Sequence, residues 1–309
     1  MTQKKRRSFV IPVLAGLGLG VLLALSLLSA KSGVFDDLNP KIEGTIQQTR
    51  IADLTVSYWQ PNPLPLQPAP VIIFSHGVRG CGTSSQYLME ALARGGYMVF
   101  APDHQDSSCS GVYDPAKASI EFFVKSELWD VNTYRDRGED IRKLVAALKQ
   151  DPQWAARVDF SKIGLLGYSL GGYTVLGLSG AWPEWKLEGV KAVLAQAPYT
   201  TPLIEKGQLD KLNIPVMYQL AMWDAYLTDH VKQPGGAYDK TPSPVWLLQL
   251  DKIDHDGFSD FKKSAARAEE RIEIQKDILY YTLWFFDRTL KGVDESLKKR
   301  PNIVDQRSK

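Results

Sequence analysis

The chain has 309 residues, of which 44% are hydrophobic and 23% are charged, so it can bury one substantial core and is neither disordered nor a protein that crosses a membrane many times. Its formal net charge is only +2, and several of its positive charges lie in the first few residues. The folded part therefore carries no basic surface for nucleic acid, and nucleic-acid binding is excluded.

The N-terminus combines a basic cluster with a long apolar segment. Basic residues at 4–7 precede an almost uninterrupted apolar run at 9–30. About 20 apolar residues can span a bilayer, whereas the apolar core of a cleavable signal peptide is about 7–15 residues long. We therefore expect residues 1–30 to direct export, either as an uncleaved membrane anchor, which the length favours, or as a cleaved signal peptide. The remaining chain would be a membrane-anchored extracytoplasmic domain, or a secreted or periplasmic protein.

Strands and helices alternate after a polar linker at 31–44. Two short strands at 45–50 and 54–59 are expected to form a hairpin. The following elements are expected, in chain order: a strand at 71–74, a helix at 86–94, a strand at 97–100, a helix at 135–149, strands at 163–166, 192–195, 216–220 and 245–250, and a final helix at 265–290. This alternation predicts an α/β fold whose mostly parallel central sheet has helices on both faces, in a domain at 45–295. Residues 296–309 are expected to be a polar C-terminal tail.

Two connections are longer than such a sheet requires. The interval 106–130 contains an apolar stretch at 120–124 that could form a helical flap, whereas the interval 200–213 is too short for a cap domain. We therefore expect no large cap domain and a fairly open site.

Ser169 is the expected nucleophile. It lies in Gly167-Tyr168-Ser169-Leu170-Gly171, between a short apolar strand and a helical stretch at 173–178. Glycines on both sides allow a turn tight enough to push the hydroxyl out over the sheet, and the following helix offers backbone N–H groups to a developing oxyanion. This strand–turn–helix context resembles the nucleophile turn of the α/β-hydrolase fold.

His255 is the expected base, because the chain has only four histidines and their positions permit elimination. His76 and His104 precede Ser169, whereas this fold requires the order serine, acid, histidine. His255 follows the last expected strand, and His230, in a polar loop, is the alternative.

Asp224 is the expected acid, which would fix the tautomer of the imidazole and stabilise the imidazolium. It comes just after the strand at 216–220, between nucleophile and base. Asp229 is the alternative, farther into the loop. Asp254 and Asp256 flank the histidine and are expected to be solvated.

Further residues complete the expected site. The segment that begins at His76 resembles the oxyanion loop of this fold, in which the Val78 and Leu170 N–H groups would hold the oxyanion. Tyr168 and Trp223, with Val78, are expected to line the substrate pocket, although Trp223 could equally be a surface aromatic. No cofactor and no metal are required, because side chains and backbone amides fill every role.

Cys81 and Cys109 are the only cysteines. Both lie in loops that follow strands at the same edge of the sheet, so a disulfide is possible in an exported chain, and two free thiols are equally compatible with the sequence.

The motifs resemble the dienelactone-hydrolase-like branch of the α/β-hydrolases between residues 71 and 292. The final helical segment, 283–292, is similar to that of the dienelactone-hydrolase-like proteins. A looser resemblance to platelet-activating-factor acetylhydrolases and polyester-degrading hydrolases rests on segments 74–77, 101–104 and 254–260. The acetylhydrolases carry their acid after the strand that follows the nucleophile helix, where this chain has no carboxylate at 195–198. Dienelactone hydrolases proper use a cysteine nucleophile, whereas this chain has Ser169, so the resemblance does not imply a lactone substrate.

The resemblance and the triad together imply a serine hydrolase that cleaves carboxylic esters, with a small-molecule or lipid ester as substrate. Three alternatives stay open on the sequence. A peptidase or amidase would use the same triad, a non-catalytic binding protein could retain the fold, and an acyltransferase would differ in how water is kept out.

Overall fold

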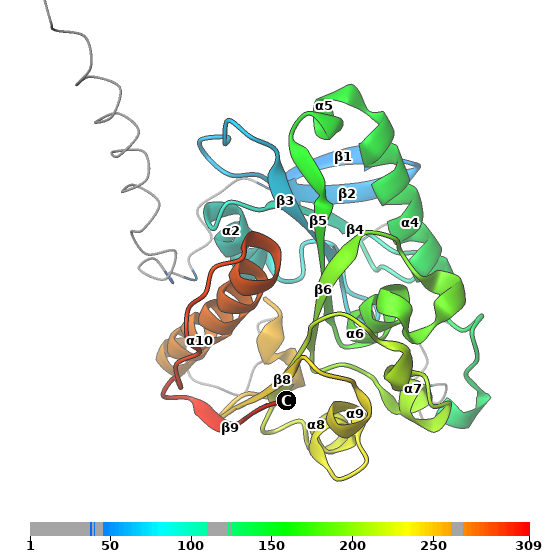
Figure 1. Cartoon of the computed structure of the whole chain (residues 1–309), viewed down its shortest axis with the longest axis vertical. Helices are drawn as coiled ribbons and strands as arrows, with labels where there is room; N and C mark the ends of the chain where they lie inside the picture. Colours follow the sequence, from blue (N-terminus) through cyan, green and yellow to red (C-terminus); the bar gives the residue numbers. More distant parts are fainter. Residues whose placement is uncertain (1–37, 39, 41–45, 110–122, 124, 261–267) are drawn as a thin grey trace, which may run out of the picture. The chain divides into compact units, whose positions relative to one another are not determined.

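A computed structural model describes residues 38, 40, 46–109, 123, 125–260 and 268–309 (Figure 1). The expected export segment at 1–30 lies outside these residues, as do nearly all of the linker at 31–44 and most of the expected flap at 120–124. Leu38–Lys309 form one compact unit. Within the described residues, no helix has the length and apolar character needed to cross a membrane.

A nine-stranded sheet in the order β1-β2-β4-β3-β5-β6-β7-β8-β9 forms the centre of this unit. Its strands are β1 (Gln47–Ile51), β2 (Leu54–Trp59), β3 (Ala69–Ser75), β4 (Met98–Pro102), β5 (Val158–Tyr168), β6 (Val190–Gln196), β7 (Val216–Ala221), β8 (Val245–Leu250) and β9 (Ile303–Ser308). The strands from β4 to β8 in this order are parallel, whereas β1, β2 and β9 pair antiparallel at the two edges. The predicted mostly parallel sheet and the predicted hairpin are confirmed.

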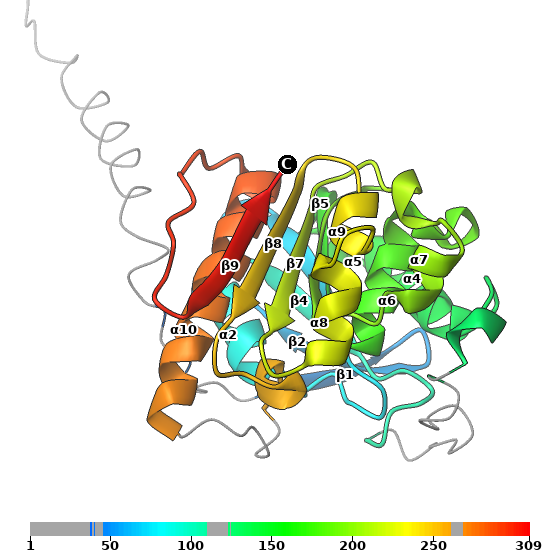
Figure 2. The same ribbon diagram turned by 90° about the horizontal axis from the view of Figure 1, so that it is seen from below.

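Helices cover both faces of the sheet (Figure 2). Figure 2 shows α2 and α10 on one face and α4, α6 and α8 on the other. The α-helices are α2 (Gln86–Arg94), α4 (Arg135–Gln150), α5 (Pro152–Ala155), α6 (Leu170–Leu176), α7 (Thr201–Glu205), α8 (Ala225–Lys232), α9 (Ala237–Lys240) and α10 (Ala268–Phe286), which continues into a wider turn at Asp287–Lys291. Because both faces are covered, every residue of β4 and β7 is buried, which explains why these strands are continuous apolar runs in the sequence.

The prediction of a polar tail at 296–309 is wrong, because the last part of this segment forms strand β9, which pairs with β8. Ile303 is buried, while Val304 is 46% exposed and the next residues are half-buried and polar. An edge strand has one neighbour and partial solvent contact, so it lacks the apolar run that identifies central strands. Arg307 joins β9 to the end of α8 by donating to the Lys232 carbonyl at 2.9 Å, and it also donates to Asp305 of the same strand at 2.6 Å.

Candidate active site

Three predicted residues meet at the carboxyl ends of parallel strands. Ser169 follows β5, Asp224 comes shortly after β7, and His255 lies in the loop after β8. The His255 Nε2 lies 2.9 Å from the Ser169 Oγ, and the His255 Nδ1 lies 2.6 Å from an Asp224 carboxylate oxygen. Asp224 accepts only if Nδ1 carries the proton, which leaves Nε2 as the acceptor for the serine hydroxyl. The side chains thus form a continuous hydrogen-bonded chain from carboxylate to nucleophile.

Close packing of glycines shapes the turn at Ser169. A Cβ added to Gly171 would lie 1.9 Å from the Ser75 carbonyl oxygen, and one added to Gly167 would lie 2.2 Å from the Gly171 oxygen. Only glycine therefore permits the first turn of α6 to approach the ends of β3 and β5. Ser169 itself takes a left-handed φ of 55° with ψ of −117°, a conformation that side-chain-bearing residues rarely adopt.

Backbone bonds between neighbouring loops fix the other two side chains. The Met222 N–H donates to the Leu250 carbonyl, and the Trp223 N–H donates to the Ile253 carbonyl, both at 2.9 Å. These bonds join the segment that bears Asp224 to the segment that bears His255. The His255 ring also lies 5.1 Å from the Tyr168 ring, so the imidazole is held on one face by an aromatic neighbour.

The alternative base and acid lie elsewhere. His230 lies in helix α8 rather than in the expected loop, and its Nδ1 pairs with the Tyr226 carbonyl of the same helix at 2.7 Å. Asp229 belongs to the same helix, one turn beyond Asp224. The structure brings His255 and Asp224 to Ser169. His230 and Asp229 do not take part in this hydrogen-bonded chain.

The expected oxyanion donors Val78 and Leu170 lie in two segments next to Ser169. Leu170 is the first residue of α6, so its N–H has no carbonyl partner within that helix. Val78 lies in the loop after β3 and lines the space on both sides of Ser169. In the part of the chain that the structure describes, neither the Val78 N–H nor the Leu170 N–H donates to a backbone carbonyl of a turn or loop. Both N–H groups therefore stay candidates for donation to a bound group.

Two hollows open beside Ser169 and His255. The smaller, about 110 Å³, is lined by Tyr168 and by the polar side chains of Ser84 and Asp256. The larger, about 450 Å³, is mostly apolar. It is lined by Phe123, from the stretch expected as a flap, and by three residues that the sequence did not indicate: Tyr199, Tyr226 and Leu227. Tyr168 thus lies where it was expected. Trp223 lines neither hollow and is 50% exposed, so the surface alternative describes it.

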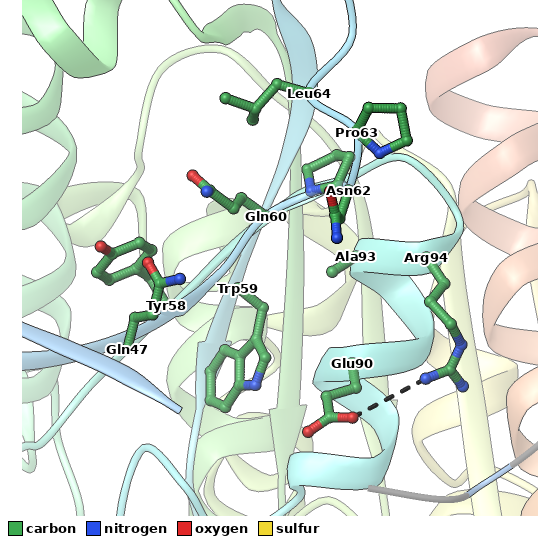
Figure 3. Close-up of a pocket in the computed structure, with 11 residues that line it drawn as sticks. Gln47, Tyr58, Trp59, Gln60, Asn62, Pro63, Leu64, Glu90, Ala93 and Arg94 are labelled. Atoms are coloured by element: carbon green, nitrogen blue, oxygen red, sulfur yellow. Dashed lines mark ion pairs between the residues drawn. The ribbon is translucent and has the colours of Figure 1, made fainter. Parts of the chain in front are cut away.

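A hollow of about 880 Å³ lies away from this chemistry (Figure 3). It is lined by the end of β2, the connection at 60–64 and the C-terminal half of α2. The connection at 60–64 leads into the amino end of β3, whereas Ser169 lies at the carboxyl end of β3, near Ser75 and His76. Glu90 and Arg94, 3.9 Å apart, are its charged groups. It holds no paired nucleophile and base.

No group of three or more His, Cys, Asp or Glu side chains is arranged to hold a metal ion in the part of the chain that the structure describes.

A buried histidine–carboxyl pair lies behind the site. The His104 Nδ1 is 3.1 Å from a carboxyl oxygen of Asp140, and both side chains are buried. Burial, followed by the nearby Arg137, lowers the pKa of His104 to about 3. Burial, reinforced by Asp136, raises the pKa of Asp140 to about 7. Between these two pKa values the pair is therefore neutral, with the proton on Asp140, and is a hydrogen bond rather than an ion pair.

Asp140 should make stability fall as pH rises. Its pKa of about 7 in the folded protein exceeds the ordinary value of 3.8, so its contribution to stability is complete below pH 3.8 and is lost as pH passes through 7. Urea unfolding at about pH 5 and about pH 8 should show that the wild type loses on the order of 2–3 kcal/mol more than Asp140→Asn over this range. Parallel pH dependences of the two proteins would contradict the assignment.

Cys81 and Cys109 form a disulfide, with Cα atoms 5.7 Å apart. It joins the loop after β3 to the loop after β4, and the Gly82 N–H adds a bond to the Asp103 carboxylate at 2.7 Å. The loop that bears Val78 is thus tied to its neighbour at two points.

Removing this disulfide should destabilise the fold. The bond joins residues with a sequence separation of 28. A cross-link of this span lowers the conformational entropy of the unfolded chain and so stabilises the fold by about 3–4 kcal/mol. The double variant Cys81→Ser, Cys109→Ser should therefore unfold at lower denaturant concentration by about that free energy. Wild-type protein under strong reductant should match the double variant, and identical midpoints in oxidised and reduced protein would refute the expectation.

The comparisons with known proteins agree with this architecture. The profile of the Dienelactone hydrolase family matches residues 58–234. An acylaminoacyl peptidase from Pyrococcus horikoshii is similar in structure, with 16% identity and a TM-score of 0.56 over 83% of this chain and 43% of the peptidase. A dienelactone hydrolase from Anabaena variabilis is similar with 15% identity and a TM-score of 0.53, over 80% of this chain and 100% of that one. No curated protein sequence matches the chain. At these identities the two structures show a shared α/β-hydrolase fold.

Proposed function

Because the chain belongs to the dienelactone hydrolase family, whose profile matches more than half of it, and has the α/β-hydrolase fold, we propose that it hydrolyses carboxylic esters with Ser169 as nucleophile, His255 as base and Asp224 as acid. The observation that carries the proposal is the hydrogen-bonded chain of 2.6 Å and 2.9 Å through His255. Its members come from three separate strand ends, and such a chain is the geometry that serine nucleophiles require.

The reaction would proceed by acyl transfer. The His255 Nε2 takes the proton from the Ser169 hydroxyl while the oxygen attacks the ester carbonyl, and the negative charge that develops on the carbonyl oxygen is held by the Val78 and Leu170 N–H groups. His255 then gives its proton to the departing alcohol, which leaves an acyl group on Ser169. Water attacks this acyl-enzyme with His255 again as base, and the free acid departs.

The two hollows support a substrate with unequal ends. The apolar hollow of about 450 Å³ suits a hydrocarbon or aromatic group of short to medium length. The hollow of about 110 Å³, with Ser84 and Asp256 in its lining, suits a small polar group. A lactone substrate is not part of the proposal, because the dienelactone hydrolases that the sequence resembles use cysteine where this chain has Ser169.

The choice between ester and amide is tested with matched substrates. We expect purified protein to turn over p-nitrophenyl esters of short to medium acyl chains much faster than p-nitroanilides of the same acids, because an amine is the poorer leaving group. The Ser169→Ala variant gives the background rate. Turnover of the anilides alone would replace the proposal by an amidase or peptidase, and turnover of neither would favour a binding protein.

We also propose that the domain acts outside the cytoplasm, delivered by the apolar segment at 9–30 as an anchor or a cleaved signal peptide. The disulfide supports this location, because disulfides persist mainly in oxidising compartments. A fusion of residues 1–44 to a reporter that is active only after export would test it. A reporter that stays inactive would refute export, and alkaline extraction of membranes would separate an anchored protein from a released one.

A further inference from the structure

The buried Arg137 guanidinium supports the oxyanion loop from behind. Arg137 lies near the start of α4 and has no solvent exposure. Its Nε and Nη2 donate to the two carboxylate oxygens of Asp106, both at 2.9 Å. Burial alone would raise the pKa of Asp106, but the paired guanidinium holds it well below the ordinary value, so the carboxylate stays charged. The planar fork is thereby fixed in one orientation.

The same guanidinium donates to two backbone carbonyls of the loop after β3. Nη1 donates to the His76 oxygen at 2.8 Å, and Nη2 donates to the Gly77 oxygen at 3.1 Å. The Gly77 oxygen also accepts the Gly80 N–H at 3.0 Å and lies 2.7 Å from the His76 Nδ1. Three donors therefore converge on one carbonyl oxygen.

The histidine is arranged to act as one of these donors. The Gly77 carbonyl can only accept, so the His76 Nδ1 must carry the proton, and the Nε2 is then free to accept the His104 N–H at 3.1 Å. Burial and the neighbouring Arg137 keep the pKa of His76 well below its usual value, which favours this neutral form. His76, Asp106 and Arg137 form one buried network around the carbonyl.

The Gly77 carbonyl belongs to the peptide group that also contains the Val78 N–H. In a trans peptide the two bonds point in opposite directions, and this peptide is not among the two cis bonds of the described chain. Arg137 holds the oxygen on the buried side, so the Val78 N–H leaves on the side of the hollows that Val78 lines with Ser169. A donor at the oxygen also polarises the amide and strengthens its N–H as a donor.

We propose that Arg137 is a positioning residue that sets the direction and strength of the Val78 N–H for the oxyanion. The inference rests on the proposed function, because it gives Arg137 a role only if Ser169 attacks a carbonyl or a similar centre. Arg137 touches neither substrate nor nucleophile and acts through the Gly77–Val78 peptide. A lysine in its place would keep the charge but could not reach Asp106 and both carbonyls at once.

The test compares Arg137→Lys with a matched control. Arg300→Lys also changes an arginine paired with a buried aspartate, because Arg300 donates to Asp277 at 2.8 Å, but it joins the segment before β9 to α10 instead of bracing the oxyanion loop. Arg137→Lys should lower kcat for an ester about 10–100-fold and leave KM within about threefold, since oxyanion contacts strengthen in the transition state. Arg300→Lys should change stability and leave kcat unchanged.

A second readout separates this inference from the proposed function. The rate at which a fluorophosphonate modifies Ser169 should fall in Arg137→Lys by a factor similar to that in kcat, because the phosphoryl oxygen occupies the oxyanion position. Equal labelling and equal kcat in a folded Arg137→Lys would overturn the role of Arg137 and leave the proposed function intact, as would a change confined to KM. An unlabelled wild type would remove the proposed function itself, and this inference with it.

Asp106→Asn covers the case in which Arg137→Lys does not fold. The amide releases one of the two guanidinium bonds and should lower kcat about 3–10-fold without a change in KM, a smaller effect because both carbonyl contacts persist. Wild-type kcat in folded Asp106→Asn would then overturn the proposal.

Discussion

Ser169→Ala is expected to lower kcat for esters by about 10⁴–10⁶-fold, because it removes the atom that forms the acyl-enzyme. The remaining rate would come from the oxyanion donors and from binding, which the substitution leaves in place. Steady-state turnover of a p-nitrophenyl ester measures the loss, and mass spectrometry after fluorophosphonate treatment should locate the adduct of the wild type on Ser169.

The outcome depends on the variant staying folded. Alanine and serine occupy the strained turn equally well in steric terms, so the denaturant midpoint should stay close to that of the wild type. Ser179, a buried serine that donates to the Val175 carbonyl at 2.7 Å, provides a control, since Ser179→Ala should retain activity. Full ester turnover by Ser169→Ala, or an adduct of equal yield in that variant, would exclude Ser169 as the nucleophile.

Asp224→Asn is expected to lower kcat by about 10⁴-fold, with little change in KM. The amide can offer its N–H₂ group to the His255 Nδ1, which then becomes an acceptor and leaves the proton on Nε2. In that tautomer the imidazole cannot take the serine proton. The 2.6 Å contact between Asp224 and His255 is the geometric basis of this expectation. A titration of kcat/KM against pH for both proteins would show whether the residual activity keeps the profile of the wild type.

Asp229→Asn is the matched control for this prediction. Asp229 lies in the same helix, was the alternative acid on the sequence, and the structure places it away from the His255 hydrogen-bond chain. Its amide variant should retain activity within about twofold, as expected for an exposed change outside the site. Loss of activity in Asp229→Asn together with an active Asp224→Asn would exchange the roles of the two residues.

The order of elements, and the three residues that the structure brings together at the candidate site, could be predicted because they depend on local patterns. Apolar runs between turns identify strands buried on both faces, and Ser169 lies in a turn whose glycines are visible in the sequence. His255 could be chosen because the chain has only four histidines and the fold restricts their order. In each case the information is carried by neighbours in the chain.

Features that depend on long-range packing were missed. Trp223 adjoins Asp224, but position in a loop does not tell which way a side chain points, and its ring turned out half exposed. Tyr199 lines the apolar hollow from the segment after β6, where the sequence drew attention only to a missing carboxylate. No local pattern in the expected helix at 135–149 marks Arg137 as buried, and only the tertiary fold shows that it is fully buried against Asp106.

The left-handed backbone conformation at Ser169 lowers the stability of the fold while it presents the proposed nucleophile. A side chain held at φ 55° and ψ −117° costs on the order of 1–3 kcal/mol, which glycine would avoid. A directed-evolution experiment that selects only for heat resistance should therefore select glycine at position 169. The resulting variants should be more stable and lack the proposed activity. A serine at this position in spite of that cost is what selection for the proposed nucleophile would produce.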